Sequence, residues 1–160
     1  MMNQIDAHFD DGKNYFRIRS CGLIINDNQV LMVKNDQDDY LYSVGGAIHL
    51  GETVEEACVR ELKEETGHSY EIDRLLFVHE NFFTMNNRPF HEIAFYFLMK
   101  PSSITKFTQN SIGFTGAKEE MVWIPLESFN QYKAYPSFFG EELTNLSLHV
   151  KHIVTKENNT

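Results

Sequence analysis

Short apolar segments separated by polar turns make up most of this chain, and the pattern predicts a fold rich in β-strands. The turns contain many Asn, Asp, Gly and Pro residues, which suit the backbone geometry of tight turns. The expected strands cover residues 16–25, 29–34, 40–44, 71–83, 91–100 and 121–126. Residues 1–13 are polar and are expected to form a loose arm.

One segment near the middle of the chain has the signature of a helix. Thr53 is a good N-cap, and Glu56 completes a capping box of the form T-x-x-E. Gly67 is a natural stop for a helix, and the residues between Thr53 and Gly67 are good helix formers. We therefore expect one helix between these two caps.

The remaining segments give weaker signals. Residues 101–118 are polar and without periodicity, and a loop of that length is often functional. In the tail, residues 141–146 are read as a short helix and residues 148–154 as a strand. Because no repeat or linker divides the chain, a single domain spanning residues 1–160 is expected.

The expected helix carries carboxylates where its pattern asks for apolar side chains. At about 100° per residue, Val54 and Cys58 lie on the stripe that should dock on a sheet. One turn further along, the same stripe holds Glu61 and Glu65, with Glu64 beside them. Charged side chains on a docking face require a specific reason.

These three acids also repel one another. Glu61 lies three and four residues before Glu64 and Glu65, and each such like-charge pair costs roughly 0.2–0.5 kcal/mol. All three lie toward the negative end of the helix dipole. A divalent cation would resolve the conflict, because Mg²⁺ and Mn²⁺ prefer hard oxygen ligands. The three acids alone would equally fit a solvated helix end. The surrounding residues therefore decide between a metal site and an exposed acidic surface.

Residues 46–67 read GAIHLGETVEEACVRELKEETG, and this stretch resembles the Nudix box. The box has the pattern G, five residues, E, seven residues, R-E, an apolar residue, any residue, E-E, any residue, G and an aliphatic residue. The matching positions are Gly46, Glu52, Arg60, Glu61, Leu62, Glu64, Glu65 and Gly67. His68 replaces the final aliphatic residue, a departure that touches no metal ligand. Eight matches within 22 residues are too many for coincidence.

The resemblance implies a fold of the α/β (α+β) class. In such a fold a mixed β-sheet is sandwiched between helices, and the box, here residues 46–68, forms a loop–helix–loop. The strand pairs before and after the box, and a late strand containing Trp123 and Pro125, fit this arrangement. The similarity covers roughly residues 16–130.

The resemblance also implies a metal site. Glu61, Glu64 and Glu65 would bind Mg²⁺ or Mn²⁺, with the carbonyl of Gly46 as a further ligand, since glycine lets the backbone approach closely. Arg60 would orient Glu61 through a salt bridge. The metal would neutralise a diphosphate and generate hydroxide from water near neutral pH.

Two further box residues are implied to support the site. Glu52 would brace the loop against the helix, and Gly67 would end the helix. Either Glu61 or Glu64 would act as general base, and the resemblance leaves the choice between them open.

Residues outside the box are expected to complete the site. Some Nudix enzymes recruit another acid from a distant loop, and Glu119 or Glu120 is the candidate here. Cationic side chains could meet the phosphates, and an aromatic ring could stack on a base. The candidates for these substrate contacts are Arg17, Arg19, Lys34 and Phe83. The alternative for each is an ordinary surface or core role.

Composition restricts the partners. The formal net charge is −9, which repels polyanions and counts against a nucleic-acid polymer as the main ligand. No apolar run approaches the roughly 20 residues that span a bilayer, and the start of the chain does not resemble a signal peptide. Cys21 and Cys58 are expected to be buried thiols, so a cytoplasmic location is expected.

The activity implied by the resemblance is hydrolysis of a phosphoanhydride bond in a nucleoside diphosphate linked to another moiety. The alternative is a Nudix-like sensor that binds nucleotides without turnover, but such domains usually lose box glutamates. Residues 81–87, NFFTMNN, carry neither the Pro often found in ADP-ribose hydrolases nor the Tyr of dinucleoside polyphosphate hydrolases. Nucleoside triphosphates, nucleotide sugars, dinucleotides and capped RNA ends all remain open. A homodimer is common in such folds.

Overall fold

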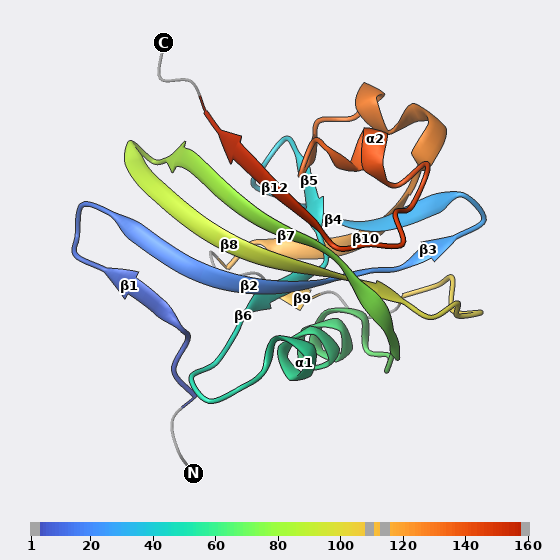
Figure 1. Cartoon of the computed structure of the whole chain (residues 1–160), viewed down its shortest axis with the longest axis horizontal. Coiled ribbons are helices and arrows are strands. Elements are labelled where there is room, and N and C mark those ends of the chain that lie inside the picture. Colours follow the sequence, from blue (N-terminus) through green and yellow to red (C-terminus); the bar gives the residue numbers. More distant parts are fainter. Residues whose placement is uncertain (1–3, 108–110, 113–115, 158–160) are drawn as a thin grey trace.

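The computed structural model of this chain describes residues 4–107, 111–112 and 116–157. In this part of the chain the strands form two six-stranded sheets, with α1 and α2 on opposite sides of the first (Figure 1). The elements are β1 (His8–Asp10), β2 (Tyr15–Leu23), β3 (Ile25–Asn26), β4 (Gln29–Asn35), β5 (Leu41–Ser43), β6 (Gly45–Ala47), α1 (Val54–Thr66), β7 (Ile72–Met85), β8 (Arg88–Met99), β9 (Ser111–Ile112), β10 (Lys118–Pro125), the 3₁₀ helix η1 (Leu126–Gln131), β11 (Ala134–Tyr135), α2 (Phe139–Glu142) and β12 (Lys151–Lys156).

The first sheet has the order β1-β2-β8-β7-β12, and β6 also pairs with β2. The β2–β8 and β7–β12 pairs are parallel, whereas β7 and β8 form a long antiparallel hairpin. Asn86 and Asn87 occupy the turn of this hairpin with φ of 53° and 59°. Two successive left-handed residues match the twist of a two-residue hairpin, and Asn tolerates that conformation better than most residues.

The second sheet has the order β11-β5-β4-β10-β9, and β3 also pairs with β4. The expected strand at residues 16–25 is therefore divided between the sheets, because β2 belongs to the first sheet and β3 to the second. The turn between β3 and β4 is again formed by two residues with positive φ, Asp27 and Asn28. The expected α+β class with mixed strand pairing is confirmed, but the strands divide between two sheets where one was expected.

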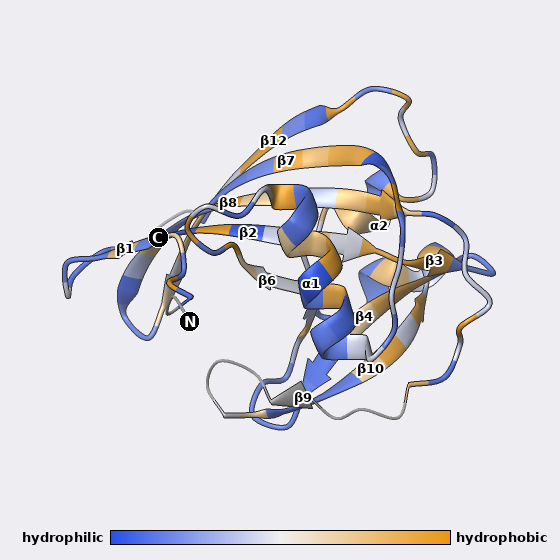
Figure 2. Cartoon of the chain, turned by 90° about the horizontal axis from the view of Figure 1, so that it is seen from below, coloured by the Kyte–Doolittle hydropathy of each residue, from blue (hydrophilic) through white to orange (hydrophobic). Residues whose placement is uncertain are grey.

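Helix α1 has the expected bounds and caps. The hydroxyl of Thr53 accepts from the backbone N–H of Glu56 at 3.2 Å, and the Glu56 carboxylate accepts from the N–H of Thr53 at 2.8 Å. Gly67 ends the helix with φ of 77°. The helix lies across the sheet face beside β2 and β6 (Figure 2), where a side chain on Gly22 would collide with Leu62. Close approach of strand and helix therefore depends on glycine at position 22.

The two ends of the chain differ from the prediction. Residues 1–3 lie outside the described residues, but residues 8–10 form β1 against β2, so the arm is paired where a loose one was expected. The helix expected at 141–146 is the four-residue α2 at Phe139–Glu142, because Phe139 is fully buried and fixes its position. The expected tail strand lies at Lys151–Lys156, parallel to β7.

The described residues form two apolar core clusters. One includes Phe77, Phe129 and Phe139, and the other lies beneath α1 and includes Cys58 and Leu62. Both cysteines of the sequence are free and buried, as expected. None of the helices in the described residues is long and apolar enough to span a membrane.

Candidate active site at the box helix

The box brings β6 and the second half of α1 together. Glu61 projects from α1 onto the face of Gly46, and a Cβ atom at position 46 would lie 2.6 Å from Oε1 of Glu61. The side chain of Glu61 is 14% exposed. The carboxylate thus occupies the space that any side chain at position 46 would need.

Arg60 joins the box loop to this carboxylate. Its guanidinium donates from Nε and Nη2 to Glu52, at 2.7 and 2.9 Å, and from Nη1 to Glu61 at 2.5 Å. It also donates to the carbonyl of Ala47 at 3.0 Å. Paired, planar contacts of this kind fix the orientation of an arginine and of its partners. The structure therefore has the contacts that the resemblance implied for Arg60 and Glu52.

Glu65 is the acid most affected by its surroundings. Its Oε2 accepts from the backbone N–H of Gly45 at 3.0 Å. Burial raises the pKa of Glu65 well above its ordinary value, and the negative charges of Glu119 and Glu61 raise it further. Burial also raises the pKa of Glu61, although Arg60 opposes this shift. Burial favours the protonated, neutral forms of Glu61 and Glu65, and a cation bound beside them would favour the charged forms.

Glu64 lies at the edge of the site. Its side chain is 60% exposed and its Oε2 lies 3.3 Å from Nη1 of Arg60. Glu61 and Glu65 therefore face the interior as the helical pattern predicted, whereas Glu64 faces solvent beside them.

The two candidate acids of β10 point in opposite directions. Glu119 is 7% exposed and accepts a hydrogen bond from the hydroxyl of Tyr42 at 2.6 Å. Glu120 is 63% exposed and lies 3.9 Å from Lys34 at the surface. Because the charge of Glu119 raises the pKa of Glu65, Glu119 is the acid that lies near the box.

The cationic candidates are also placed differently. Arg19 donates to the carbonyl of Gly45 at 2.8 Å, and its charge favours the ionised forms of Glu61 and Glu65. Arg17 is bound to the buried Glu92 at 2.6 Å. Arg19 is thus the strand cation that touches the box.

Lys34 and Phe83 have contacts away from the box glutamates. The nearest carboxylate to Lys34 is the exposed Glu120. Phe83 stacks on Phe90 beside the turn of the β7–β8 hairpin, with ring centroids 5.1 Å apart. A substrate contact by either of them, or by Arg17, stays a prediction.

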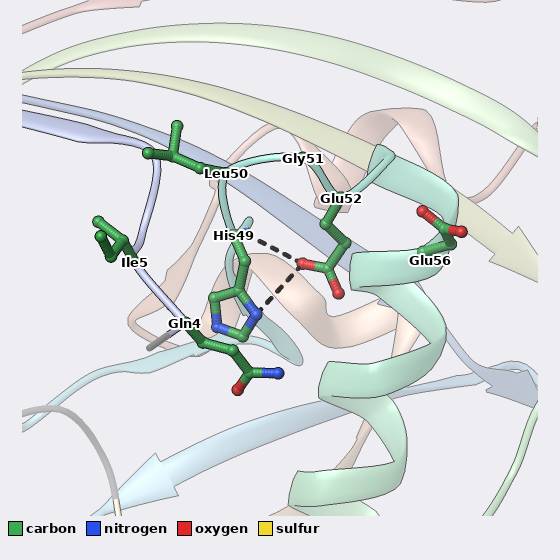
Figure 3. Close-up of a pocket in the computed structure, with 7 residues that line it drawn as sticks. All are labelled: Gln4, Ile5, His49, Leu50, Gly51, Glu52 and Glu56. Carbon is green, nitrogen blue, oxygen red and sulfur yellow. Dashed lines mark hydrogen bonds and ion pairs between the residues drawn. The ribbon is translucent and has the colours of Figure 1, made fainter. Parts of the chain in front are cut away.

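Sequence reasoning missed three residues around the site. Tyr42 binds Glu119, and its position in a short strand gave no signal of this contact. His49 donates its backbone N–H to Glu52 at 2.9 Å, and its ring lies beside the same carboxylate (Figure 3). Asp6 lies on the far side of the His49 ring. The spacing of His49 and Glu52, three residues apart in a turn, was the only signal available.

The donor set matches a hard divalent cation in its chemistry, since it consists of carboxylate oxygens and backbone carbonyls. Among the described residues, however, no group of three or more His, Cys, Asp and Glu side chains is arranged to hold a metal ion as it stands. The reason is visible in the hydrogen bonds, because Glu61 is turned toward Arg60 and Glu65 toward Gly45.

The fold and this box can be compared with known protein families. The NUDIX domain family model matches residues 16–140. The chain therefore belongs to the NUDIX domain family.

One curated relative is similar in sequence, and solved structures share the fold. An ADP-ribose pyrophosphatase of Methanocaldococcus jannaschii is 41% identical over 63 residues, which cover 38% of this chain and 37% of that relative's length. A MutT protein of Bacillus halodurans has the same fold, with a TM-score of 0.63, 14% identity and coverage of 88% and 90% of the two chains. A MutT NUDIX hydrolase of Burkholderia pseudomallei gives a TM-score of 0.56, 24% identity and coverage of 70% and 84%.

Proposed function

We propose that this chain is a hydrolase that uses Mg²⁺ or Mn²⁺ to cut the diphosphate bond of a nucleoside diphosphate linked to another moiety. The observation that carries the proposal is the convergence of Glu61 and Glu65 beside Gly45 and Gly46, with the charge of Glu119 close by. Burying repelling acids is costly unless a positive charge balances them. The family to which the chain belongs supports the same proposal.

The proposed ligands are the carboxylates of Glu61, Glu64 and Glu65 and the carbonyl of Gly46. We prefer Glu119 to Glu120 as the additional acid, because Glu119 is buried near Glu65. When bound, the ion would neutralise the diphosphate and lower the pKa of an attacking water.

The chain's own residues would do the rest. Arg60, fixed by Glu52, holds the Glu61 carboxylate in place. Among Arg17, Arg19 and Lys34, we propose Arg19 as the phosphate contact, because it lies at the carbonyl of Gly45 beside the box. A carboxylate oxygen of Glu61 or Glu64 would accept the proton of the attacking water. Glu64 is the more exposed of the two, and Glu61 lies closer to Arg60, at 2.5 Å against 3.3 Å.

The substrate should be a small nucleotide-like diphosphate. ADP-ribose is the first compound to test, because the relative from Methanocaldococcus jannaschii bears the name ADP-ribose pyrophosphatase. The absence of a proline in residues 81–87 keeps nucleoside triphosphates, nucleotide sugars, dinucleotides and capped RNA in the comparison. A homodimer and a cytoplasmic location stay predictions.

The test is a hydrolysis assay over these five classes with Mg²⁺ or Mn²⁺ and with EDTA, followed by chromatography of the products. Glu64→Gln is the informative variant, because the side chain is exposed and its replacement leaves the core intact. Glu55→Gln, on the exposed first turn of the same helix, is the matched control. We expect metal-dependent release of a nucleoside monophosphate that Glu64→Gln abolishes and Glu55→Gln retains.

The sensor alternative gives a different result. Saturable nucleotide binding with background hydrolysis, the same in the wild type and in Glu64→Gln, would favour a binding domain. Hydrolysis that persists unchanged in EDTA would contradict the metal dependence.

A further inference from the structure

Residues 5–7 of the N-terminal arm, just before β1, lie against the loop that carries the box residues. The backbone N–H of Leu50 donates to the carbonyl of Ile5, and that of Ala7 donates to the carbonyl of Ile48, both at 2.8 Å. These hydrogen bonds flank an isolated antiparallel bridge between residues 6 and 49. The arm thus fixes the backbone of the loop immediately before Glu52.

The side chains continue this contact toward the site. The His49 ring lies between two carboxylates, with Nε2 3.5 Å from Oδ1 of Asp6 and Nδ1 3.6 Å from Oε2 of Glu52. The side chains of His49 and Glu52 are only 18% and 15% exposed. Figure 3 shows the ring and the backbone N–H of His49 directed at the same Glu52 carboxylate. Glu52 is therefore held from the loop side as well as by Arg60.

The contacts form a continuous series from the arm to the proposed metal ligand. Glu52 takes two hydrogen bonds from Arg60, and Arg60 donates to Glu61. Arg60 also has an alternative partner in Glu64, at 3.3 Å. If the Glu52 carboxylate were free to rotate, Arg60 would no longer be fixed, and its guanidinium could bind Glu64 in place of Glu61.

We infer that Asp6 and His49 are positioning residues for the reaction, through which the N-terminal arm holds Glu52, Arg60 and finally the carboxylate of Glu61. The inference rests on the proposed function, since it concerns the same site. Neither residue touches the reacting atoms, so their loss should lower turnover and metal affinity and leave substrate affinity unchanged. Residues that hold the metal ligands without touching the metal typically contribute 10- to 100-fold to metal affinity or to activity.

The test compares three variants with two controls. His49→Phe keeps a ring of similar size but removes both nitrogens, His49→Gln keeps a polar group able to reach a carboxylate, and Asp6→Asn removes one charge. Asp10→Asn is the control for the arm, because Asp10 pairs with Arg88 away from the box. His149→Phe is the control for the ring change, because the exposed His149 lies in the C-terminal tail, where its backbone N–H donates to Ser147.

Three quantities are measured on the full chain: kcat and KM on the best substrate of the panel, and the affinity for Mn²⁺ from the electron paramagnetic resonance signal of the free ion. We expect His49→Phe to lower kcat and weaken Mn²⁺ binding by about tenfold with KM unchanged. Asp6→Asn should give a smaller fall in both, and His49→Gln should recover most of the loss. The controls should match the wild type.

Wild-type kcat and Mn²⁺ affinity in His49→Phe would overturn the inference. So would losses that the controls share, or a loss of kcat explained entirely by a smaller folded fraction in circular dichroism. If the wild type hydrolyses no member of the panel, the proposed function fails, and the Mn²⁺ titration alone decides whether the two residues position Glu61. A wild type that binds no Mn²⁺ would overturn both proposals.

Discussion

The carboxylate of Glu61 lies in the space that a side chain on Gly46 would occupy. The two residues come from different elements, β6 and α1, and their contact joins the loop of the box to its helix. The atoms in question are the far end of a flexible side chain, so the contact constrains the position of Glu61 more than it constrains folding. This distinction gives the first prediction.

Gly46→Ala should fold but lose activity. The new methyl group would displace the Glu61 carboxylate, and a misplacement of about 1 Å can cost on the order of 100-fold in rate. We expect kcat to fall by about 10- to 100-fold with a melting temperature close to that of the wild type. Steady-state kinetics and circular dichroism check the two parts. A fully active Gly46→Ala would show that Glu61 has no fixed position in the reaction.

Gly45→Ala, in contrast, should lower the stability of the fold. Gly45 has φ of 145°, and a Cβ atom there would collide with the backbone of Ser20 and Cys21. Alanine is strained at this φ, and the backbone atoms of Ser20 and Cys21 cannot move without disturbing β2. We therefore expect a loss of at least about 1–3 kcal/mol in the free energy of unfolding. Urea denaturation measures it, with Gly46→Ala as the comparison. Equal stability of the two variants would contradict the prediction.

The stability of the metal-free protein should fall as the pH rises. Burial raises the pKa of Glu65 above the ordinary 4.5, so the folded state keeps a proton that the unfolded chain has lost. From about pH 4.5 up to the raised value, the folded state binds more protons, and stability therefore decreases with pH. Melting temperatures in EDTA between pH 5 and 8 should fall less in Glu65→Gln than in the wild type.

Bound metal should offset the loss of stability that the metal-free protein shows as the pH rises. Mg²⁺ that binds the folded state alone raises its stability, and it should do so in the wild type more than in Glu65→Gln. Glu55→Gln should behave as the wild type in both series. Parallel pH curves for the wild type and Glu65→Gln in EDTA would show that Glu65 is not the responsible group.

The thiol of Cys58 should be inert in the native protein. Burial raises its pKa to about 12, so at pH 8 only roughly one molecule in ten thousand carries the reactive thiolate. Cys21 is buried as well, and burial raises its pKa in the same direction. A disulfide-exchange reagent should label neither thiol in buffer and both in guanidinium chloride. Rapid labelling of the native protein would contradict the burial of these residues.

The sequence by itself determined the helix and its acidic face. Thr53, Glu56 and Gly67 act within a few residues of one another, so the caps could be identified without knowledge of the fold. The helical period likewise placed Glu61 and Glu65 on the docking side. The two-residue turns at Asp27 and Asn86 also follow from local backbone preference.

Only the tertiary structure decided which distant residues meet the box. Glu119 and Glu120 are adjacent in sequence, and successive side chains of a strand point to opposite faces. Which face is buried depended on the pairing of β10 with β4, and this pairing directs Glu119 inward and Glu120 toward Lys34. Residues 5–7 of the arm were misjudged for the same reason, because their backbone pairs with residues more than forty positions away. Such pairings depend on the assembled sheets, and no local pattern encodes them.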